Sequence, residues 1–178
     1  MYYDIIMAGF GGQGIQIISQ LVAVASINKG LEVTYLPSYG VEKRGGRTNV
    51  FLVISDREIG SPVTNHPSAL LVMDQNSFDT YIPMLRPDGL LVANGSLINT
   101  SSYKRDDIVS CCIFCNEEAI KLGNPRLANM IALGAFLKHI NFLTIDDIKN
   151  IMNEVIPERL SHTIDLNMQA LQHGNAIA

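Results

Sequence analysis

Short apolar runs, separated by polar, glycine-rich or proline-containing stretches, predict a chain of alternating strands and helices. Apolar runs bounded by turn residues are typical of strands that are buried on both faces of a sheet. We expect such strands over residues 5–8, 33–36, 69–73, 90–93 and 108–114. Residues 49–54 should form a further strand that returns through residues 55–57 to an edge strand over residues 58–63, so one antiparallel pairing is expected.

Apolar residues at helical spacing fill the segments between these strands. A helix should begin at Ile15, and shorter helices are expected over residues 77–85 and 117–122. Capping signals for three more helices are Asn124-Pro125, Thr144 with Asp147, and Pro157. The first of these, over residues 126–140, is apolar around most of its circumference, so the core or a partner subunit should bury it on more than one side. The tail after Gly174 should fray.

This alternation predicts an α/β fold with three layers, α/β/α, around a mainly parallel sheet with an antiparallel excursion and a Rossmann-like start. The 178 residues suffice for one well-cored domain and are few for two, so residues 1–178 should form a single domain. Apolar residues make up 47% of the chain and charged residues only 17%. That leaves little charge for the surface of a monomer, which favours a buried subunit interface.

A glycine-rich turn joins the first strand to the first helix. Gly9, Gly11 and Gly14 satisfy the G-x-G-x-x-G pattern, in which N–H groups at a helix N-terminus approach a phosphate. A nicotinamide or flavin site also needs an acidic residue at the end of the second strand, but Leu36 is followed here by Pro37. A dinucleotide is therefore disfavoured. An anion site and a tight, ligand-free turn with close helix–strand packing both stay open.

A second polar loop, over residues 38–48, follows the second strand. Its glycines and cations are Gly40, Gly45, Gly46, Lys43, Arg44 and Arg47. Arginine presents a planar fork of donors to phosphate or carboxylate, and glycine lets a ligand approach the backbone. The loop is either an anion clamp or a solvated turn before the next strand.

Charge and hydropathy exclude several classes of protein. The formal net charge of −4, with no basic stripe, argues against nucleic acid as a partner. The uncharged residues 5–28 are long enough to span a membrane, but their glycines and glutamines favour a buried strand, loop and helix. Asp4 stands where a secretory signal would be basic, so we expect a cytoplasmic protein without a membrane segment.

Residues that carry chemistry do not form a catalytic constellation. The cysteines are Cys111, Cys112 and Cys115, and the histidines are His66, His139, His162 and His173. The single C-x-x-C pair lacks a second pair of ligands, so core thiols in a reducing compartment are favoured over a metal or cluster site. The histidines lack ligand spacing to one another. We expect no catalytic residue and no metal ligand on this chain, only binding loops.

Several ordered blocks resemble the gamma subunit, or gamma domain, of the 2-oxoacid:ferredoxin oxidoreductases. They are Gly9-x-Gly11-Gly12-Gln13-Gly14, Ser38-Tyr39-Gly40-x-Glu42-x-Arg44-Gly45-Gly46, Ile54-Ser55-Asp56, Ser61-Pro62, and Gly123-Asn124-x-Arg126-x-x-Asn129-Met130 with Gly134. These blocks span most of the chain, and their combination is far more specific than the first glycine loop. Val41 departs from the pattern, because the family often has proline there.

The resemblance implies a subunit of an enzyme that oxidatively decarboxylates a 2-oxoacid, forms an acyl-CoA and passes electrons to ferredoxin. It places thiamine diphosphate on alpha and beta subunits and iron–sulfur clusters on other chains, such as a delta-type subunit. The short stand-alone length looks most like the 2-oxoglutarate type. The pyruvate, branched-chain 2-oxoacid and indolepyruvate types are alternatives.

The resemblance also suggests which residues face CoA or the partner subunits. They are Gly11, Gly12, Gln13, Gly14, Tyr39, Glu42, Arg44, Gly45 and Gly46. Arg44 would meet a CoA phosphate or a carboxylate of a partner. Two other classes stay open: a stand-alone nucleotide-dependent oxidoreductase, and a purely structural assembly module.

Overall fold

The computed structural model describes residues 1–39 and 46–178. Within these ranges six strands form one sheet of order β2-β3-β1-β4-β5-β6. The strands are β1 (Tyr2–Phe10), β2 (Glu32–Tyr39), β3 (Arg47–Ser55), β4 (Ala69–Val72), β5 (Leu90–Asn94) and β6 (Val109–Ile113). The apolar runs of the sequence therefore mark these strands, to within a few residues at their ends.

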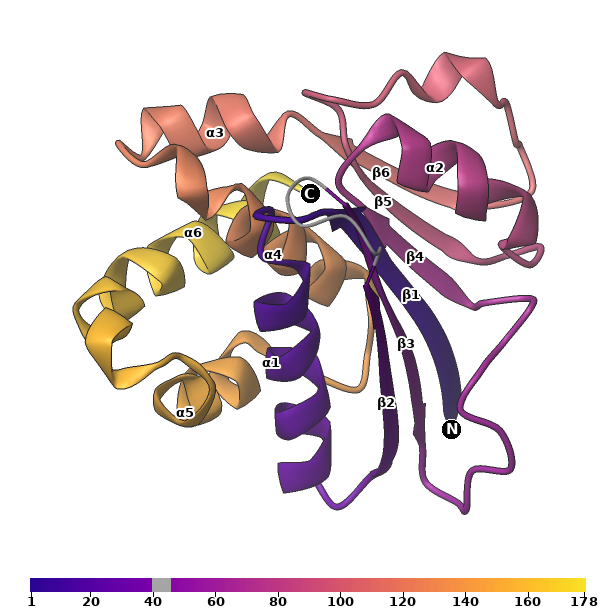
Figure 1. The fold of residues 1–178 in the computed structure, drawn as a ribbon, viewed down its shortest axis with the longest axis horizontal. Coiled ribbons are helices and arrows are strands. Elements are labelled where there is room, and N and C mark those ends of the chain that lie inside the picture. Colours follow the sequence, from indigo (N-terminus) through magenta and orange to yellow (C-terminus); the bar gives the residue numbers. More distant parts are fainter. Residues whose placement is uncertain (40–45) are drawn as a thin grey trace.

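Helices cover both faces of this sheet. They are α1 (Ile15–Asn28), α2 (Gln75–Tyr81), α3 (Cys115–Lys121), α4 (Ala128–His139), α5 (Ile145–Val155) and α6 (Ile164–Ile177). Short 3-10 turns are η1 (Ile82–Met84), η2 (Thr100–Ser102), η3 (Pro125–Leu127) and η4 (Glu158–Thr163). Helices α1, α4, α5 and α6 pack on one face, and α2 lies on the other (Figure 1). The expected three-layer α/β/α architecture is confirmed.

The antiparallel strand lies where it was expected, but it pairs with different segments. Strand β3 pairs antiparallel with both β1 and β2, whereas β1, β4, β5 and β6 are parallel neighbours. The antiparallel excursion is therefore confirmed, but its predicted partner, residues 58–63, is not a strand. The Ser61 hydroxyl donates to the Val63 carbonyl at 3.0 Å in a local turn, and Pro62 has no N–H for a ladder.

A buried carboxylate directs the segment before β4. The Asp4 carboxylate accepts hydrogen bonds from the Thr64 hydroxyl at 2.8 Å and from the Ser68 N–H at 2.9 Å. Asp4 itself lies on β1, with only 7% of its surface exposed. Because these bonds satisfy the buried charge, they hold the segment against β1 and place β4 beside it.

One of the three capping signals begins an α-helix directly, whereas Asn124 and Pro157 each precede a 3-10 turn. The Thr144 hydroxyl accepts from the Asp147 N–H at 3.2 Å, and the Asp147 carboxylate accepts from the Thr144 N–H at 2.8 Å, which completes the expected capping box. The Asn124 side chain accepts from the Arg126 N–H at 3.0 Å, but a 3-10 turn intervenes before α4 begins at Ala128.

Helix α4 is buried by the sheet on one side and by α6 on the other. A Cβ at Gly134 would lie 2.0 Å from the Leu171 carbonyl oxygen, and one at Gly174 would lie 2.0 Å from that of Ile131. The two glycines thus let the helix backbones approach closely. The expected fraying after Gly174 is wrong, because this contact holds α6 in place and the helix continues to Ile177.

We expect Gly134→Ala to lower the free energy of unfolding by about 2 kcal/mol, because the added methyl overpacks the α4–α6 contact. The helix-propensity gain of about 1 kcal/mol would only partly offset this cost. Denaturant unfolding followed by circular dichroism measures the change. Gly60→Ala is the matched control, because a Cβ there meets open space. Equal midpoints for the two variants would contradict the close approach of the helices.

Candidate functional site

The glycine turn lies where β1 ends and α1 begins, at the carboxyl edge of the parallel strands. Gly12 and Gly14 have φ values of 101° and 75°, in the left-handed region that disfavours other residues. A Cβ at Gly14 would also lie 2.2 Å from Asn129 Nδ2. Both glycines are therefore required by the backbone path, and Gly14 by its close neighbour on α4 as well.

The side chain of Gln13 closes this turn from the inside. Gln13 Oε1 accepts from the Phe10 N–H at 2.9 Å, and Gln13 Nε2 donates to the Met73 carbonyl at 3.0 Å. A Cβ at Gly9 would lie 2.5 Å from the same Oε1 atom, so Gly9 makes room for the carboxamide. The Phe10 N–H, which in a nucleotide-binding loop would be open to a phosphate, already has an acceptor.

Sheet topology also argues against a dinucleotide site. In the Rossmann arrangement the strand after the first helix lies beside the first strand and ends in the acid that holds the ribose. Here β3 lies between β1 and β2, so the end of β2 is two strand spacings, about 10 Å, from β1. The glycine turn therefore has the Rossmann pattern without the neighbouring strand that completes the site.

The two loops predicted to bind meet at one point. The Gly11 N–H donates to the Gly46 carbonyl at 2.9 Å, and Phe10 is opposite Arg47 in the β1–β3 ladder. Tyr39 is the last residue of β2 and is paired with Thr48. The structure thus brings Gly11, Gly12, Gln13 and Gly14 together with Gly46 and the ends of the second loop. The candidates Glu42, Lys43, Arg44 and Gly45 lie outside the described residues.

Shallow depressions flank the glycine turn on both sides. One, of about 330 Å³, includes Phe10, Gly12, Gln13, Asn116, Ile120 and Arg126 in its lining. The other, of about 390 Å³, includes Gly11, Gly12, Gly14, Gln16, Ile17 and Thr48. Our reasoning from individual residues missed Asn116 and Ile120. Their one sequence signal was an isoleucine within a predicted short helix, and it is a weak signal.

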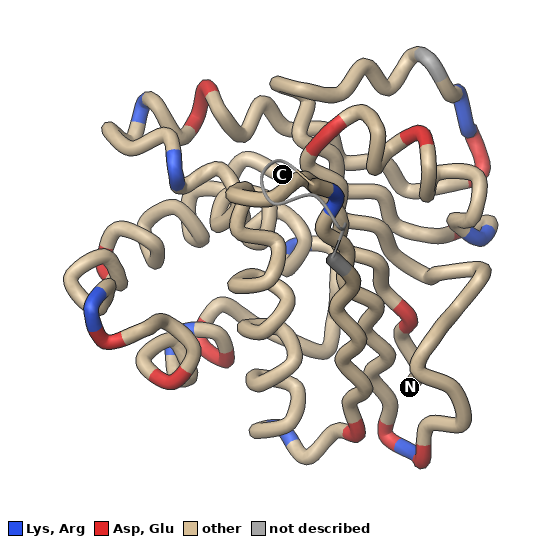
Figure 2. The backbone as a smooth tube through the Cα atoms, viewed as in Figure 1, with Lys and Arg blue, Asp and Glu red and all other residues tan. Residues whose placement is uncertain are grey.

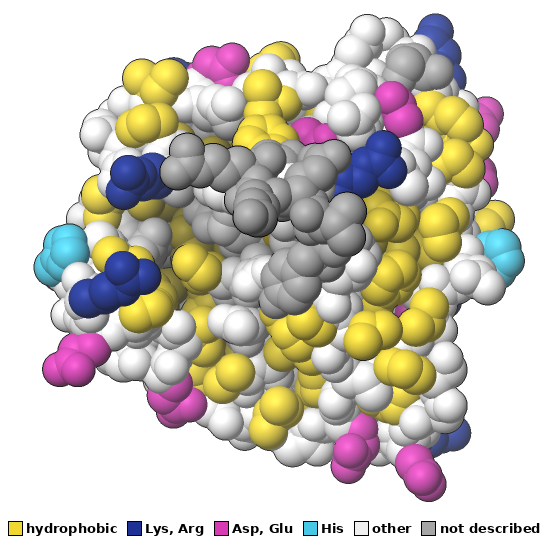
Figure 3. Space-filling view, viewed as in Figure 1, with side chains coloured by type: hydrophobic (Ala, Val, Ile, Leu, Met, Phe, Trp, Pro, Cys, Tyr) yellow, Lys and Arg dark blue, Asp and Glu magenta, His cyan; other side chains and the backbone are white. Residues whose placement is uncertain are grey.

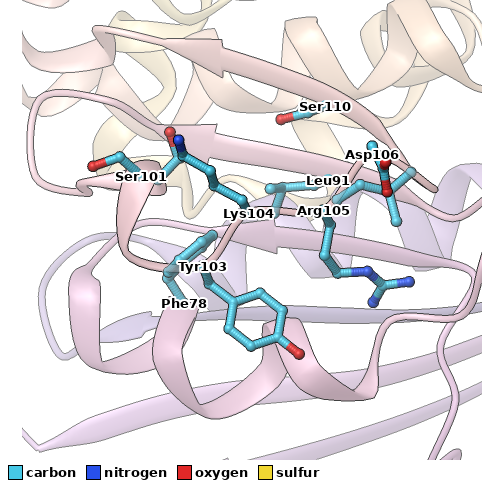
Figure 4. Close-up of a pocket in the computed structure, with 10 residues that line it drawn as sticks. Phe78, Leu91, Ser101, Tyr103, Lys104, Arg105, Asp106 and Ser110 are labelled. Atoms are coloured by element: carbon cyan, nitrogen blue, oxygen red, sulfur yellow. The ribbon is translucent and has the colours of Figure 1, made fainter.

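A larger depression, of about 640 Å³, lies away from the glycine turn (Figure 4). Phe78 and Leu91 are among the residues that line it, together with Lys104 and Arg105. The Arg105 guanidinium is held by the Asp107 carboxylate and by backbone carbonyls of the η1 turn and the residue after it. This arginine therefore links the segment before β6 to the layer of α2. Because its guanidinium already has these partners, we do not assign it to an anion site.

The surface charge is sparse and has no single focus. In Figure 2 the lysine, arginine, aspartate and glutamate residues of the described ranges are scattered over outer turns and element ends, with long uncharged stretches along α1 and the strands. None of the helices in these ranges combines the length and apolarity of a membrane span. No group of three or more His, Cys, Asp or Glu side chains there is placed to hold a metal ion.

The cysteines differ in their environment. Cys111 and Cys115 are buried, as expected for core thiols, whereas Cys112 is exposed, which corrects that expectation for one of the three. Burial raises the pKa of Cys115 to about 12, and partial burial raises the pKa values of Cys111 and Cys112 as well. Because successive side chains of β6 point to opposite faces of the sheet, Cys112 is on the other face from Cys111.

Comparison with known proteins identifies the family. The fold and the paired loops define an α/β domain with a closed glycine turn. A family model described as pyruvate ferredoxin/flavodoxin oxidoreductase matches residues 4–177. The chain belongs to this family, and the resemblance inferred from the sequence blocks is confirmed.

The relatives differ in how much of their length this chain covers. The 2-oxoglutarate synthase subunit KorC of Methanocaldococcus jannaschii is 27% identical over 180 residues, which cover 100% of this chain and 95% of that protein. The ketoisovalerate oxidoreductase subunit VorA of Methanothermobacter thermautotrophicus is 28% identical over 175 residues, but the match covers 94% of this chain and 35% of VorA. The chain thus spans about a third of VorA and nearly all of KorC.

A solved structure supports the same assignment. The gamma subunit of a keto/oxoacid ferredoxin oxidoreductase from Geobacter sulfurreducens PCA superposes with a TM-score of 0.79 at 26% identity. The superposition covers 97% of this chain and 95% of that subunit. The fold is therefore that of a gamma subunit over 97% of the chain.

Replacing Gln13 with leucine should lower the free energy of unfolding by about 1–3 kcal/mol, because the Phe10 N–H and the Met73 carbonyl lose their partner. Thermal and denaturant unfolding of the isolated chain measure this change. Gln169→Leu, at an exposed position of α6, is the control and should stay within about 0.5 kcal/mol of the parent. If both variants matched the parent, the carboxamide would not be holding the turn closed.

The exposed and buried thiols should differ in reactivity. A maleimide reagent should modify Cys112 in the native chain, while Cys111 and Cys115 should react only after denaturation, because burial blocks access to their sulfur atoms. Peptide mass spectrometry after labelling locates the modified residues. Rapid labelling of Cys115 in the native state would show that the α3–β6 junction opens.

Proposed function

We propose that the chain is the gamma subunit of a multi-subunit 2-oxoacid:ferredoxin oxidoreductase of the 2-oxoglutarate type. The observation that carries this proposal is the match to KorC over 95% of that protein's length, within a family model that covers residues 4–177. Its complex would convert a 2-oxoacid, CoA and oxidised ferredoxin to an acyl-CoA, carbon dioxide and reduced ferredoxin in the cytoplasm.

The proposal assigns the redox chemistry to other chains. Thiamine diphosphate would be held by alpha and beta subunits, and iron–sulfur clusters by a delta-type subunit that passes electrons to ferredoxin. This chain would support or complete the site, and we expect it to be inactive alone. Two observations favour this role over a stand-alone nicotinamide or flavin enzyme. The glycine turn is closed by Gln13, which leaves no open phosphate loop, and β2 is not adjacent to β1 in the sheet.

The two loops would form the binding surface of this subunit. Gly11, Gly12, Gln13 and Gly14 would face CoA or the partner chains together with Tyr39, Glu42, Arg44, Gly45 and Gly46. The hydrogen bond from Gly11 to Gly46 supports this grouping, because it joins the first loop to the end of the second. Arginine at position 44 would meet a CoA phosphate or a partner carboxylate.

The branched-chain 2-oxoacid type is the second candidate. The ketoisovalerate subunit VorA is as similar to this chain in sequence as KorC, at 28% against 27% identity. The KorC match spans both chains almost completely, whereas the VorA match spans about a third of VorA. Substrate choice would in any case be decided on the thiamine-bearing chains.

Purification through a tag on this chain tests the assignment directly. We expect thiamine- and cluster-bearing chains to co-purify and to reduce viologen in the presence of CoA and 2-oxoglutarate. Pyruvate and 2-oxoisovalerate are assayed in parallel, and omission of CoA is the control. A faster rate with 2-oxoisovalerate would replace the proposed type by the second candidate. A chain that purifies alone and binds a nicotinamide or flavin would overturn the proposal.

Replacing Arg44 with alanine should raise the KM for CoA by about tenfold or more, as expected for the loss of a charge-assisted contact. If Arg44 instead meets a partner carboxylate, the complex should dissociate at lower salt than the parent complex. Lys149→Ala, at a surface position of α5, is the control. Unchanged CoA kinetics together with an intact complex would reject the binding role of this loop. A purely structural assembly module would then be the remaining hypothesis.

A further inference from the structure

The crossover from β5 to β6 leaves part of the sheet uncovered. Connections between parallel strands are usually α-helices that pack on the strands they join. Residues 95–108, all within the described ranges, instead form an irregular loop with the 3-10 turn η2. Ser110 of β6, paired with Leu91 of β5 on the face that α2 covers, therefore remains exposed. The depression of about 640 Å³ lies between this loop, α2 and the two strands (Figure 4).

The floor of this depression is apolar. Phe78 and Leu91 beneath it are almost completely buried in the core between the sheet and α2. Ile108 is half-buried, and the Tyr103 ring keeps 41% of its surface exposed, so these two side chains offer apolar contact area. The volume is within the range of roughly 300–1,000 Å³ that small-molecule sites occupy. The depression therefore has room for a ligand with an apolar body.

The loop that forms the outer wall is held at both ends. Asn99 Oδ1 accepts from the Ser101 N–H at 3.1 Å, and the Asn99 N–H donates to Gln75 Oε1 on α2 at 2.8 Å. Further along the loop, Arg105 Nε donates to Asp107 Oδ1 at 2.7 Å, and its Nη1 donates to the carbonyls of the η1 turn. The wall is thus in place before a ligand binds, so little conformational entropy is lost on binding.

Two ionised side chains of the lining have no ion-pair partner within residues 1–39 and 46–178. They are Lys104 and Asp106. Figure 4 shows Lys104 extending toward the side of Ser101, whereas Asp106 and the Arg105 guanidinium lie on the opposite side. In Figure 3, charged and hydrophobic side chains both reach the surface over α2 and this loop, at the upper right. The charge is therefore separated, with an open cation at one end of the depression and an acid at the other.

This separation of charge restricts the ligand. An ammonium group binds an anionic oxygen through charge-assisted hydrogen bonds, and Lys104 has its three donors open to such an oxygen. A second negative charge on the ligand would meet repulsion from Asp106. A neutral apolar ligand would gain nothing from the ammonium group. The chemistry of the lining is therefore best matched by a single negative charge on an apolar body.

We propose that the depression between the β5–β6 loop and α2 binds a small monocarboxylic acid with an apolar body. Its carboxylate meets Lys104, and its apolar body lies on Ile108 and Tyr103. This site lies away from the glycine turn. The inference does not depend on the proposed function, because it uses only side chains of this chain that the two binding loops do not include.

Titration of the full-length chain with hexanoate at pH 7 tests the proposal, with chemical shifts of the ¹⁵N-labelled backbone as the measurement. We expect saturable shifts at residues that line the depression, within residues 78–110. Hexanamide has the same apolar body without the charge and should bind about tenfold or more weakly. Acetate, which lacks the apolar body, should also bind more weakly. Absence of saturable shifts with hexanoate, or equal binding of hexanamide, would overturn the proposal.

Lys104→Ala tests the cation, with Lys149→Ala, at an exposed position of α5, as the matched control. Lys104→Ala should weaken hexanoate binding by about tenfold or more and leave hexanamide binding unchanged, whereas Lys149→Ala should bind both as the parent does. Thermal melting confirms that each variant is folded. Equal hexanoate affinity in Lys104→Ala and the parent would show that the carboxylate is not held there.

Ser110→Trp tests the location, because Ser110 is exposed and lines the depression, so a large side chain there fills the volume. Ser161→Trp, at an exposed position of η4, is its control. We expect Ser110→Trp to abolish hexanoate binding and Ser161→Trp to retain it. Retention of binding by a folded Ser110→Trp variant would reject this depression as the site.

Two further outcomes would also overturn the proposal. Hexanoate shifts confined to residues 9–14 would place the ligand at the glycine turn. Tighter binding of 6-aminohexanoate than of hexanoate would show that Asp106 takes a cationic group, so a zwitterion would replace the monocarboxylate as the ligand class. Neither outcome affects the proposed function, which is tested separately by the chains and the activity that co-purify with this subunit.

Discussion

Strand β1 is the constraint on which the arrangement of the whole chain depends. It lies between antiparallel β3 and parallel β4, and its residues Ile5, Ile6, Met7 and Ala8 are completely buried. A strand with no exposed face must be covered on both sides, which sets α1 and α4 on one face and α2 on the other. At its carboxyl end, the Gln13 carboxamide joins the Phe10 N–H to the Met73 carbonyl after β4.

The glycine turn shows that one sequence pattern can serve two physical purposes. In a nucleotide-binding protein the glycines leave N–H groups open to a phosphate. Here Gly9 makes room for Gln13, and Gly14 makes room for Asn129, so the space freed by the missing side chains is filled by carboxamides of the chain itself. The result is a rigid turn whose outer surface, around Gly12 and Phe10, is presented at the edge of the sheet.

Low charge and exposed apolar side chains are the features of this surface that favour an interface with another chain. Charged residues make up 17% of the sequence, and large apolar side chains remain exposed beside α3. Such surface is costly in water for an isolated domain but is typical of the centre of an interface. Membership of the pyruvate ferredoxin/flavodoxin oxidoreductase family gives this surface a context, because some relatives carry the same region within a longer chain.

The sequence by itself determined most of the elements, the α/β class and the family. Local signals account for this: buried strands show as apolar runs, Thr144 and Asp147 form their capping box between neighbouring residues, and the family blocks are contiguous. Tertiary structure alone decided that β3 is inserted beside β1, that Gln13 fills the glycine turn, and that Gly174 packs against α4 so that α6 does not fray. These features depend on contacts between residues far apart in the chain. Local propensity carries no information about such contacts, because the energy that selects them comes from packing and from the pairing of buried polar groups.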